Sequence, residues 1–185
     1  MRSLFTLLLI FVIPFTLFAQ IPSDMDSIKL EMQNRIEKST GKPFSSFQAE
    51  AVDGVSYSQS NLIGKITLIN FWFELCAPCV AELDALNKLY NTFKANPKFQ
   101  FISFSVDAPE LARESIKRYN LLYPVISISH EECYRLNCNL GFPTTIIVDE
   151  RGNIVVIKHG GHIEKQAVEE DIDKIARIIQ ENLNK

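Results

Sequence analysis

The chain has 185 residues, enough for one domain with a full hydrophobic core. Its 19 Lys and Arg residues are outnumbered by 22 Asp and Glu residues. A mildly acidic chain without a basic cluster argues against a nucleic-acid partner. Four cysteines are too few for a protein held together by disulfides, so they favour redox chemistry or one structural bridge.

The N-terminus has the pattern of a secretory signal peptide. Arg2 precedes an almost entirely apolar run at residues 4–18, and Ala19 is a small residue at a plausible cleavage point. A membrane anchor is the alternative, but the run is shorter than the ~20 residues of a spanning helix and Pro14 interrupts it. We therefore expect residues 1–19 to be removed and the chain to be exported as a soluble protein. A bacterial periplasm, where disulfides persist, is the expected location.

Two local elements precede the main pattern. Apolar residues recur at helical spacing within residues 24–38, which predicts an amphipathic helix. Short extended pieces around an Asp-Gly turn predict a small hairpin within residues 44–63. We expect residues 20–40 to form a helical lead-in and residues 41–185 to form the single domain.

From residue 66 onward, strands and helices alternate. Runs of β-branched and aromatic residues predict strands at 66–73, 99–106, 123–129, 144–149 and 154–159. Apolar periodicity and start signals predict helices from Cys79 to about residue 94, at 109–119, at 131–137 and at 164–183. This order predicts an α/β fold with a mixed central sheet flanked by helices on both sides and an N-terminal hairpin extension.

Cys76 and Cys79 form a Cys-Ala-Pro-Cys motif where a buried strand passes into a helix. A cysteine at a helix N-terminus faces unpaired N–H groups and the positive end of the helix dipole, which favour the thiolate. We expect Cys76 to attack and Cys79 to resolve the mixed disulfide. Half of a zinc site and a static bridge are the alternatives. Cys133 and Cys138 have an unusual spacing for the missing zinc ligands.

Residues 64–86 resemble the thioredoxin superfamily, and within it the exported TlpA/ResA-like group. The resemblance covers most of residues 41–183 and continues through short motifs at 105–107, 123–125, 141–155 and 159–161. It implies a thioredoxin-like fold and thiol–disulfide exchange with protein substrates. It implies no bound cofactor, and we expect no metal.

The resemblance also implies a substrate groove. Pro143 matches the family's cis-proline, in a loop that lies beside Cys76. A cis bond would turn the backbone of Phe142 outward, where it could pair with an extended substrate segment. Trp72 matches a family aromatic, and its position favours the core over the contact surface, although it is included among the substrate-binding residues. Leu75 stands where the family commonly has Trp, which leaves substrate preference open.

The proton relay departs from that of ordinary thioredoxins, because Asn70 stands where they carry a buried Asp. The resemblance instead implies a relay role for Glu82, three residues after Cys79 and on the same helix face. A partly buried carboxylate has a raised pKa and can exchange protons with the resolving thiol. A solvated surface position is the alternative for Glu82. Glu74 is expected to be an exposed loop charge.

Cys133 and Cys138 do not belong to the family pattern. A local structural disulfide is the favoured interpretation, with free thiols or a second redox pair as alternatives. The three histidines show no metal-ligand spacing with one another, and each is expected at the surface or at a strand end.

We therefore expect an exported thiol–disulfide oxidoreductase that acts as a reductant of protein disulfides, for example in apocytochrome c. An upstream membrane or exported redox partner would recharge it. The direction rests on the resemblance and on Ala77, which offers no charge or donor to a Cys76 thiolate. A thiol peroxidase of related fold usually carries a lone cysteine in a different loop. A copper-binding assembly protein usually spaces its two cysteines four apart. Both are kept as alternatives.

Overall fold

The computed structural model describes residues 16–185 of the chain. Residues 1–15, and with them most of the signal peptide predicted at residues 1–19, lie outside the described residues. Within residues 16–185, no helix is both long enough and apolar enough to cross a membrane. The chain divides into two compact units between Asn34 and Arg35.

The described part of the first unit belongs to helix α1 (Thr16–Ser39). The helix predicted at residues 24–38 is therefore present, and it begins earlier than predicted. Met25 and Ile28, which the periodicity places on its apolar face, are exposed. The apolar spacing thus predicted the helix but not the environment of these two side chains.

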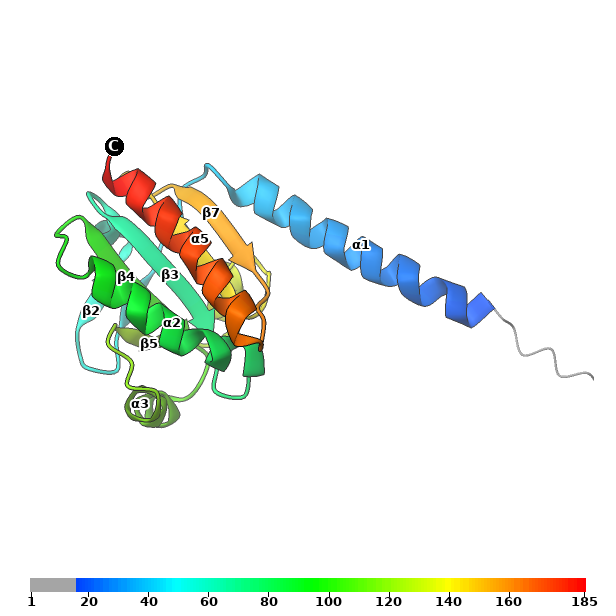
Figure 1. Cartoon of the computed structure of the whole chain (residues 1–185), viewed down its shortest axis with the longest axis horizontal. Helices are drawn as coiled ribbons and strands as arrows, with labels where there is room; N and C mark the ends of the chain where they lie inside the picture. Colours follow the sequence, from blue (N-terminus) through cyan, green and yellow to red (C-terminus); the bar gives the residue numbers. More distant parts are fainter. Residues whose placement is uncertain (1–15) are drawn as a thin grey trace, which may run out of the picture. The chain divides into compact units, whose positions relative to one another are not determined.

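The second unit is built on a five-stranded sheet with the strand order β5-β4-β3-β6-β7 (Figure 1). The strands are β3 (Ile66–Trp72), β4 (Phe99–Ser105), β5 (Val125–Ser127), β6 (Thr144–Val148) and β7 (Ile154–His159). The first three are parallel, whereas β6 runs antiparallel to β3 and β7 antiparallel to β6. All seven residues of β3 are buried, as expected for a central strand that is covered on both faces. The predicted mixed sheet is confirmed.

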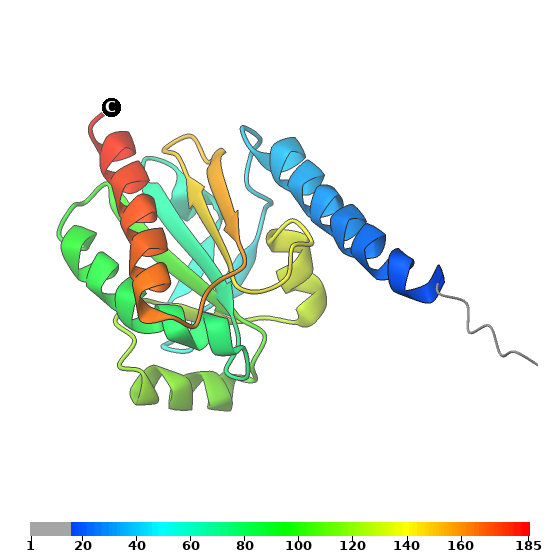
Figure 2. The same ribbon diagram turned by 45° about the vertical axis from the view of Figure 1, so that its right-hand side comes forward.

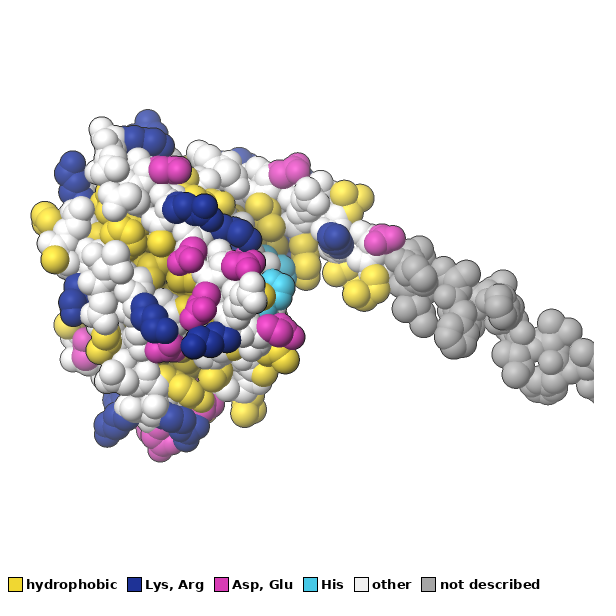
Figure 3. Space-filling model, viewed as in Figure 1, with side chains coloured by type: hydrophobic (Ala, Val, Ile, Leu, Met, Phe, Trp, Pro, Cys, Tyr) yellow, Lys and Arg dark blue, Asp and Glu magenta, His cyan; other side chains and the backbone are white. Residues whose placement is uncertain are grey.

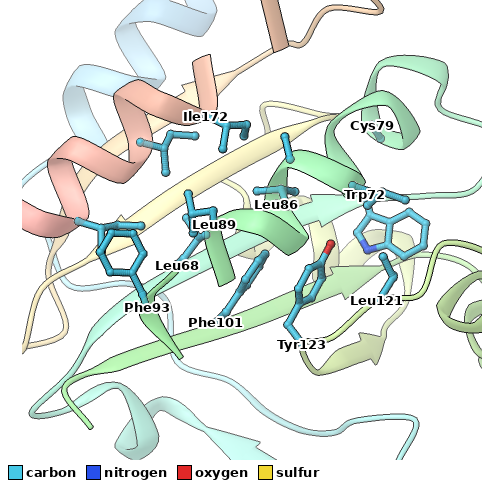
Figure 4. Packing of buried hydrophobic residues seen from close by; sticks show 14 of the residues in the cluster. Leu68, Trp72, Cys79, Leu86, Leu89, Phe93, Phe101, Leu121, Tyr123 and Ile172 are labelled. Atoms are coloured by element: carbon cyan, nitrogen blue, oxygen red, sulfur yellow. The ribbon is translucent and has the colours of Figure 1, made fainter. Parts of the chain in front are cut away.

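Helices cover the sheet. They are α2 (Ala77–Phe93), α3 (Pro109–Arg118), α4 (His130–Leu136) and α5 (Lys165–Leu183). Helices α2 and α5 pack together on one face (Figures 1 and 2). The core beneath them contains Leu68 and Trp72 from β3, Leu86 from α2 and Ile172 from α5 (Figure 4). Because strand side chains alternate between faces, the neighbouring Phe71 belongs to the opposite side.

The segment that precedes the sheet contributes to that opposite side. Strands β1 (Gln48–Glu50) and β2 (Ser56–Ser58) form the predicted antiparallel hairpin, and the 3₁₀ helix η1 (Gln59–Leu62) leads into β3. Aromatic rings of this segment pack in a row with rings of the sheet, in the order Phe44, Phe47, Phe104 and Phe71. The hairpin extension is thereby attached to the sheet by aromatic packing.

The surface over α2 and α5 carries basic and acidic side chains side by side (Figure 3). Two pairs follow the i,i+4 spacing of a helix: Asp84 with Lys88 at 2.8 Å and Lys165 with Glu169 at 3.8 Å. This face therefore presents mixed charge rather than a field of one sign.

Candidate active site

The loop between β3 and α2 carries the cysteine pair. Cys76 and Cys79 form a disulfide with their Cα atoms 5.2 Å apart. Cys76 is the N-cap of α2, and its Sγ accepts a hydrogen bond from the Cys79 backbone N–H at 3.3 Å. Cys76 is 7% exposed and Cys79 only 1% exposed. The more accessible cysteine therefore lies at the positive end of the helix, and the second lies one turn inside. Figure 4 shows Cys79 on this helix, beside the core.

The loop before β6 lies against this segment. The Phe142–Pro143 peptide bond is cis, as predicted. The carbonyl of Pro143 accepts a hydrogen bond from the Gly160 N–H at 2.9 Å. At Gly161, a Cβ atom would lie 2.8 Å from Pro143 Cγ and 3.4 Å from Pro78 Cβ. Pro143, in the loop before β6, and Pro78, at the start of α2, therefore both come close to Gly161.

Phe142 belongs to a row of aromatic rings at this loop. Its ring packs edge-on against Phe73, with ring centroids 5.1 Å apart, and against Tyr134 at 6.0 Å. Phe142 is half-buried, whereas Leu75, directly before Cys76, is 87% exposed. Apolar side chains therefore lie at the surface next to the cysteine pair.

Trp72 does not reach that surface. Its side chain is fully buried, and its indole Nε1–H donates to Ser103 Oγ at 2.8 Å. The expectation that Trp72 contacts substrate was therefore wrong. Its place in β3 explains this, because Trp72 has the same strand parity as Leu68 and points with it into the core under α2.

Glu82 lies on α2 with only 1% of its surface exposed. One carboxylate oxygen, Oε1, accepts a hydrogen bond from the ammonium group of Lys158 on β7. The other, Oε2, has no hydrogen-bond partner among the described side chains and backbone. Burial raises the pKa of Glu82, and Lys158 opposes that rise. Glu82 is thus more deeply buried than predicted, and Lys158 is a neighbour that the sequence did not reveal.

Glu74 was predicted to be an exposed loop charge, and this was wrong. Its side chain is 8% exposed and forms an ion pair with Arg118 of α3. It also accepts hydrogen bonds from Ser115 Oγ at 2.5 Å and from the Tyr119 hydroxyl at 3.0 Å. Its backbone N–H donates to Asp107 Oδ2 at 2.8 Å. Helix α3 and the residue after it thus supply donors to the loop that carries Cys76.

The donors to Glu74 share one face of α3. Ser115, Arg118 and Tyr119 are separated by three and four positions, the spacing of neighbours on a helix surface. This pattern could have indicated a polar contact face on α3. It could not have named the partner, which lies more than forty residues earlier in the chain.

The expected disulfide between Cys133 and Cys138 is not formed, and both cysteines are free. Cys133 is on the buried side of α4, where burial raises the pKa of its thiol to about 12. Cys138 lies beyond the end of that helix, half-buried and with a left-handed backbone at φ 62°. The two thiols therefore lie in different surroundings: Cys133 is buried within α4, and Cys138 is half-buried after the helix ends.

Comparison with known proteins places this geometry in a family. Residues 40–157 match the model of the AhpC/TSA family. The thiol-disulfide oxidoreductase ResA of Halalkalibacterium halodurans is 32% identical over 139 residues, which are 73% of this chain and 76% of that protein. ResA of Bacillus cereus is 26% identical over 175 residues, 94% of each chain.

Solved structures agree. The thioredoxin domain of a thiol-disulfide oxidoreductase from Bacteroides vulgatus superposes with a TM-score of 0.61 and 26% identity, covering 74% of this chain and 97% of that one. A thiol:disulfide interchange protein from Bacteroides sp. superposes with a TM-score of 0.63 and 25% identity, covering 76% and 90%. Sequence, fold and the cysteine pair lead to one conclusion: the chain belongs to the AhpC/TSA family and is a thiol–disulfide oxidoreductase of thioredoxin-like fold.

Proposed function

We propose that this thiol–disulfide oxidoreductase is an exported reductant of protein disulfides, with Cys76 as the attacking and Cys79 as the resolving cysteine. The observation that carries the assignment of roles is their position on α2. Cys76 caps the helix and is the more accessible cysteine, at 7% exposed, whereas Cys79 lies one turn further along the helix and is 1% exposed.

The reaction starts from the dithiol form. The Cys76 thiolate attacks one sulfur of a substrate disulfide, so that a mixed disulfide forms and the other substrate sulfur leaves as a thiolate. The Cys79 thiolate then attacks Cys76 Sγ and releases the first substrate sulfur. Two electrons pass from the cysteine pair to the substrate, and the pair becomes the disulfide. An upstream redox partner would restore the dithiol.

Glu82 is the proposed acceptor of the Cys79 proton in the second step. It is a buried carboxylate with one oxygen free of hydrogen bonds, and burial raises its pKa. A carboxylate with a raised pKa is a stronger base, so it is better matched to a thiol than an exposed glutamate is. The position of Glu82 one helical turn beyond Cys79 supports this role.

The proposed substrate is an extended segment of another exported protein that contains a disulfide. Phe142 and Pro143 would bind its backbone beside Cys76. The exposed Leu75, directly before Cys76, adds an apolar surface next to the nucleophile. Apocytochrome c is a substrate to be tested first, because its cysteines must be reduced before haem attachment. A Cys79→Ala variant should retain mixed disulfides, from which the bound proteins can be identified.

We propose that electrons flow from the cysteine pair to the substrate, because few interactions stabilise a Cys76 thiolate. Ala77 supplies no charge and no side-chain donor, so the helix end is the main stabilising feature. We expect a reduction potential nearer to that of thioredoxin, about −270 mV, than to that of the oxidant DsbA, about −120 mV. Equilibration with a glutathione redox series measures it. A value above about −160 mV would indicate an oxidase or isomerase instead.

The roles of the two cysteines are tested by substitution. Cys76→Ser should abolish exchange, whereas Cys79→Ser should attack once and remain linked to its substrate. Iodoacetamide should label Cys76 faster than Cys79 in the reduced protein. Faster labelling of Cys79 would reverse the assignment.

Export is proposed on the N-terminal sequence pattern, with residues 1–19 removed and residues 41–185 forming the catalytic domain. Expression of the full chain in a bacterium, followed by fractionation and mass measurement, tests this. A chain that retains residues 1–19 in the membrane fraction would contradict cleavage.

A further inference from the structure

A line of charged side chains runs from Glu82 toward the surface. The Lys158 ammonium group binds Glu82 Oε1 and lies 3.6 Å from Asp171 Oδ2 on α5. His162 Nε2 lies 3.7 Å from the same Asp171 oxygen. The exposed fraction of the side chains rises along this line, from 1% for Glu82 through 20% for Lys158 to 52% for His162. The line therefore joins a buried carboxylate to solvent.

Glu82 is confined by its surroundings as well as bound by Lys158. A Cβ atom at Gly161 would lie 2.9 Å from Glu82 Oε1, and the same atom would meet Pro143 and Pro78. Oε1 is thus enclosed between Lys158 and the backbone at Gly161, below the Pro143 loop. This leaves Oε2 as the oxygen that can take up a proton without breaking an existing hydrogen bond.

We propose that Lys158 is a positioning residue for disulfide exchange, which holds Glu82 by Oε1 and keeps it ionised, so that Oε2 can receive the Cys79 proton. This inference rests on the proposed role of Glu82. When Glu82 is ionised, the Glu82–Lys158 pair is neutral as a whole. When Glu82 is protonated, the Lys158 ammonium group loses the carboxylate that it contacts directly and keeps only Asp171 at 3.6 Å, which costs free energy. Lys158 therefore returns Glu82 to its basic form after each transfer.

The other charged groups around Glu82 shift its pKa in opposite directions. Asp171, from α5, is a negative charge that favours protonated Glu82, whereas a protonated His162, from the loop before α5, opposes it. Tyr123 packs in the core under α2, and burial together with the charge of Glu82 raises the pKa of its hydroxyl, so it stays neutral. Cys79 is the thiol of the same helix face. Lys158 is the cation in direct contact with the carboxylate.

Substitution of Lys158 tests the proposal in the full chain. Lys158→Met removes the charge, and Lys158→Gln removes the charge but keeps a donor. Both should raise the pKa of Glu82 by about 1–3 units, the usual effect of a close opposite charge. The acid limb of the pH–rate profile for reduction of a model disulfide should move upward by the same amount. Lys158→Arg should stay near the wild type. NMR titration of the Glu82 side-chain carboxyl in the reduced protein reads the pKa directly.

Two variants provide matched controls. Lys174→Met removes an exposed cation that binds Asp171 Oδ1 at 3.0 Å and does not contact Glu82, so it should leave the profile unchanged. Asp171→Asn removes the neighbouring negative charge and should move the profile in the opposite direction, toward lower pH. Thermal unfolding confirms that each variant is folded at the assay temperature.

The outcomes separate this proposal from the one on which it rests. If the pKa of Glu82 in Lys158→Met equals that in the wild type, the proposed role of Lys158 is overturned. An equal loss of rate when Lys158→Met is added to Glu82→Gln would also overturn it, because Lys158 would then act independently of Glu82. If the titration moves but Glu82→Gln exchanges at the wild-type rate, the two residues are coupled but Glu82 is not the relay. That result would overturn the relay role and with it the role of Lys158.

Discussion

Two glutamates lie close to the cysteine pair, and their surroundings differ. Glu74, on the loop before Cys76, forms an ion pair with Arg118 and accepts hydrogen bonds from Ser115 and Tyr119. Glu82, on the helix after Cys79, has one donor, Lys158, and one oxygen without a partner. Both side chains are less than a tenth exposed.

The difference lies in how completely each carboxylate is satisfied. A carboxylate that is bound on all sides is stabilised in its charged form and connects the elements that donate to it. A buried carboxylate with a free oxygen retains part of its desolvation cost, so its pKa rises and it can change protonation state. We infer that Glu74 anchors the loop to α3, whereas Glu82 exchanges protons.

Among substitutions of the two glutamates and their partners, the largest effect is expected from Glu82→Gln. Losing a general acid–base group costs about 10²–10⁴ in rate, so resolution of the mixed disulfide should slow by this order. The domain should remain folded, because the amide fills the same volume. Stopped-flow reduction of a model disulfide across pH gives the comparison. A pH–rate profile that coincides with that of the wild type would remove Glu82 from the chemistry.

Glu74→Ala should act on stability instead. It leaves the buried Ser115 hydroxyl and the half-buried Tyr119 hydroxyl without their acceptor, which costs about 1–3 kcal/mol for a buried group. Urea unfolding measures this, and Glu114→Ala, at an exposed position on the same helix, is the matched control. The exchange rate of the folded variant should stay within a few-fold of the wild type. A rate loss as large as that of Glu82→Gln would mean that the two glutamates are not distinct in role.

The pH dependence of stability sharpens the comparison. Above the ordinary glutamate pKa of 4.5 the unfolded chain loses the Glu82 proton, while the folded protein, with its raised pKa, still holds it. The contribution of Glu82 to stability is therefore full below pH 4.5 and is lost as pH rises through the folded-state pKa. Relative to the wild type, Glu82→Gln should gain stability over this window. Equal slopes of unfolding free energy against pH in the two proteins would contradict a raised pKa.

The smallest effect is expected from Tyr119→Phe. It removes one donor to Glu74 and keeps Ser115 and Arg118, so we expect a loss of about 0.5–1.5 kcal/mol in urea unfolding. A double-mutant cycle with Glu74→Ala should show that most of this loss disappears when the carboxylate is absent. Full additivity of the two losses would exclude a direct contribution from the hydrogen bond.

The parts of this protein that could be predicted from sequence depend on local pattern. The continuous apolar run of β3 predicted a buried central strand, and the Cys-Ala-Pro-Cys motif at its end predicted the helix that Cys76 caps. The Phe142–Pro143 cis bond followed from the resemblance to a family. The preference for Trp72 in the core is confirmed as well, and strand parity explains it, since Trp72 lies on the same face of β3 as Leu68.

The missed contacts join residues that are far apart in the chain. Lys158 lies 76 positions after Glu82, and the donors to Glu74 lie 41 to 45 positions after it. A single charged residue in a strand or helix pattern looks like a solvated side chain, because periodicity reports which face is apolar and not which charges meet. The cysteines at 133 and 138 show the same limit, because their separation in sequence did not reveal that Cys133 is enclosed on the buried side of α4.

Gly161 has a consequence for how the sequence can vary among relatives. Six of the seven glycines have positive φ angles, a backbone conformation that favours glycine over other residues. Gly161 is constrained by space, since an added methyl group would meet Pro143, Glu82 and Pro78 at once. Relatives that carry a larger residue at this position should therefore also differ at the position of Glu82 or in the Pro143 loop. Covariation among these positions in an alignment would record the contact without any structure.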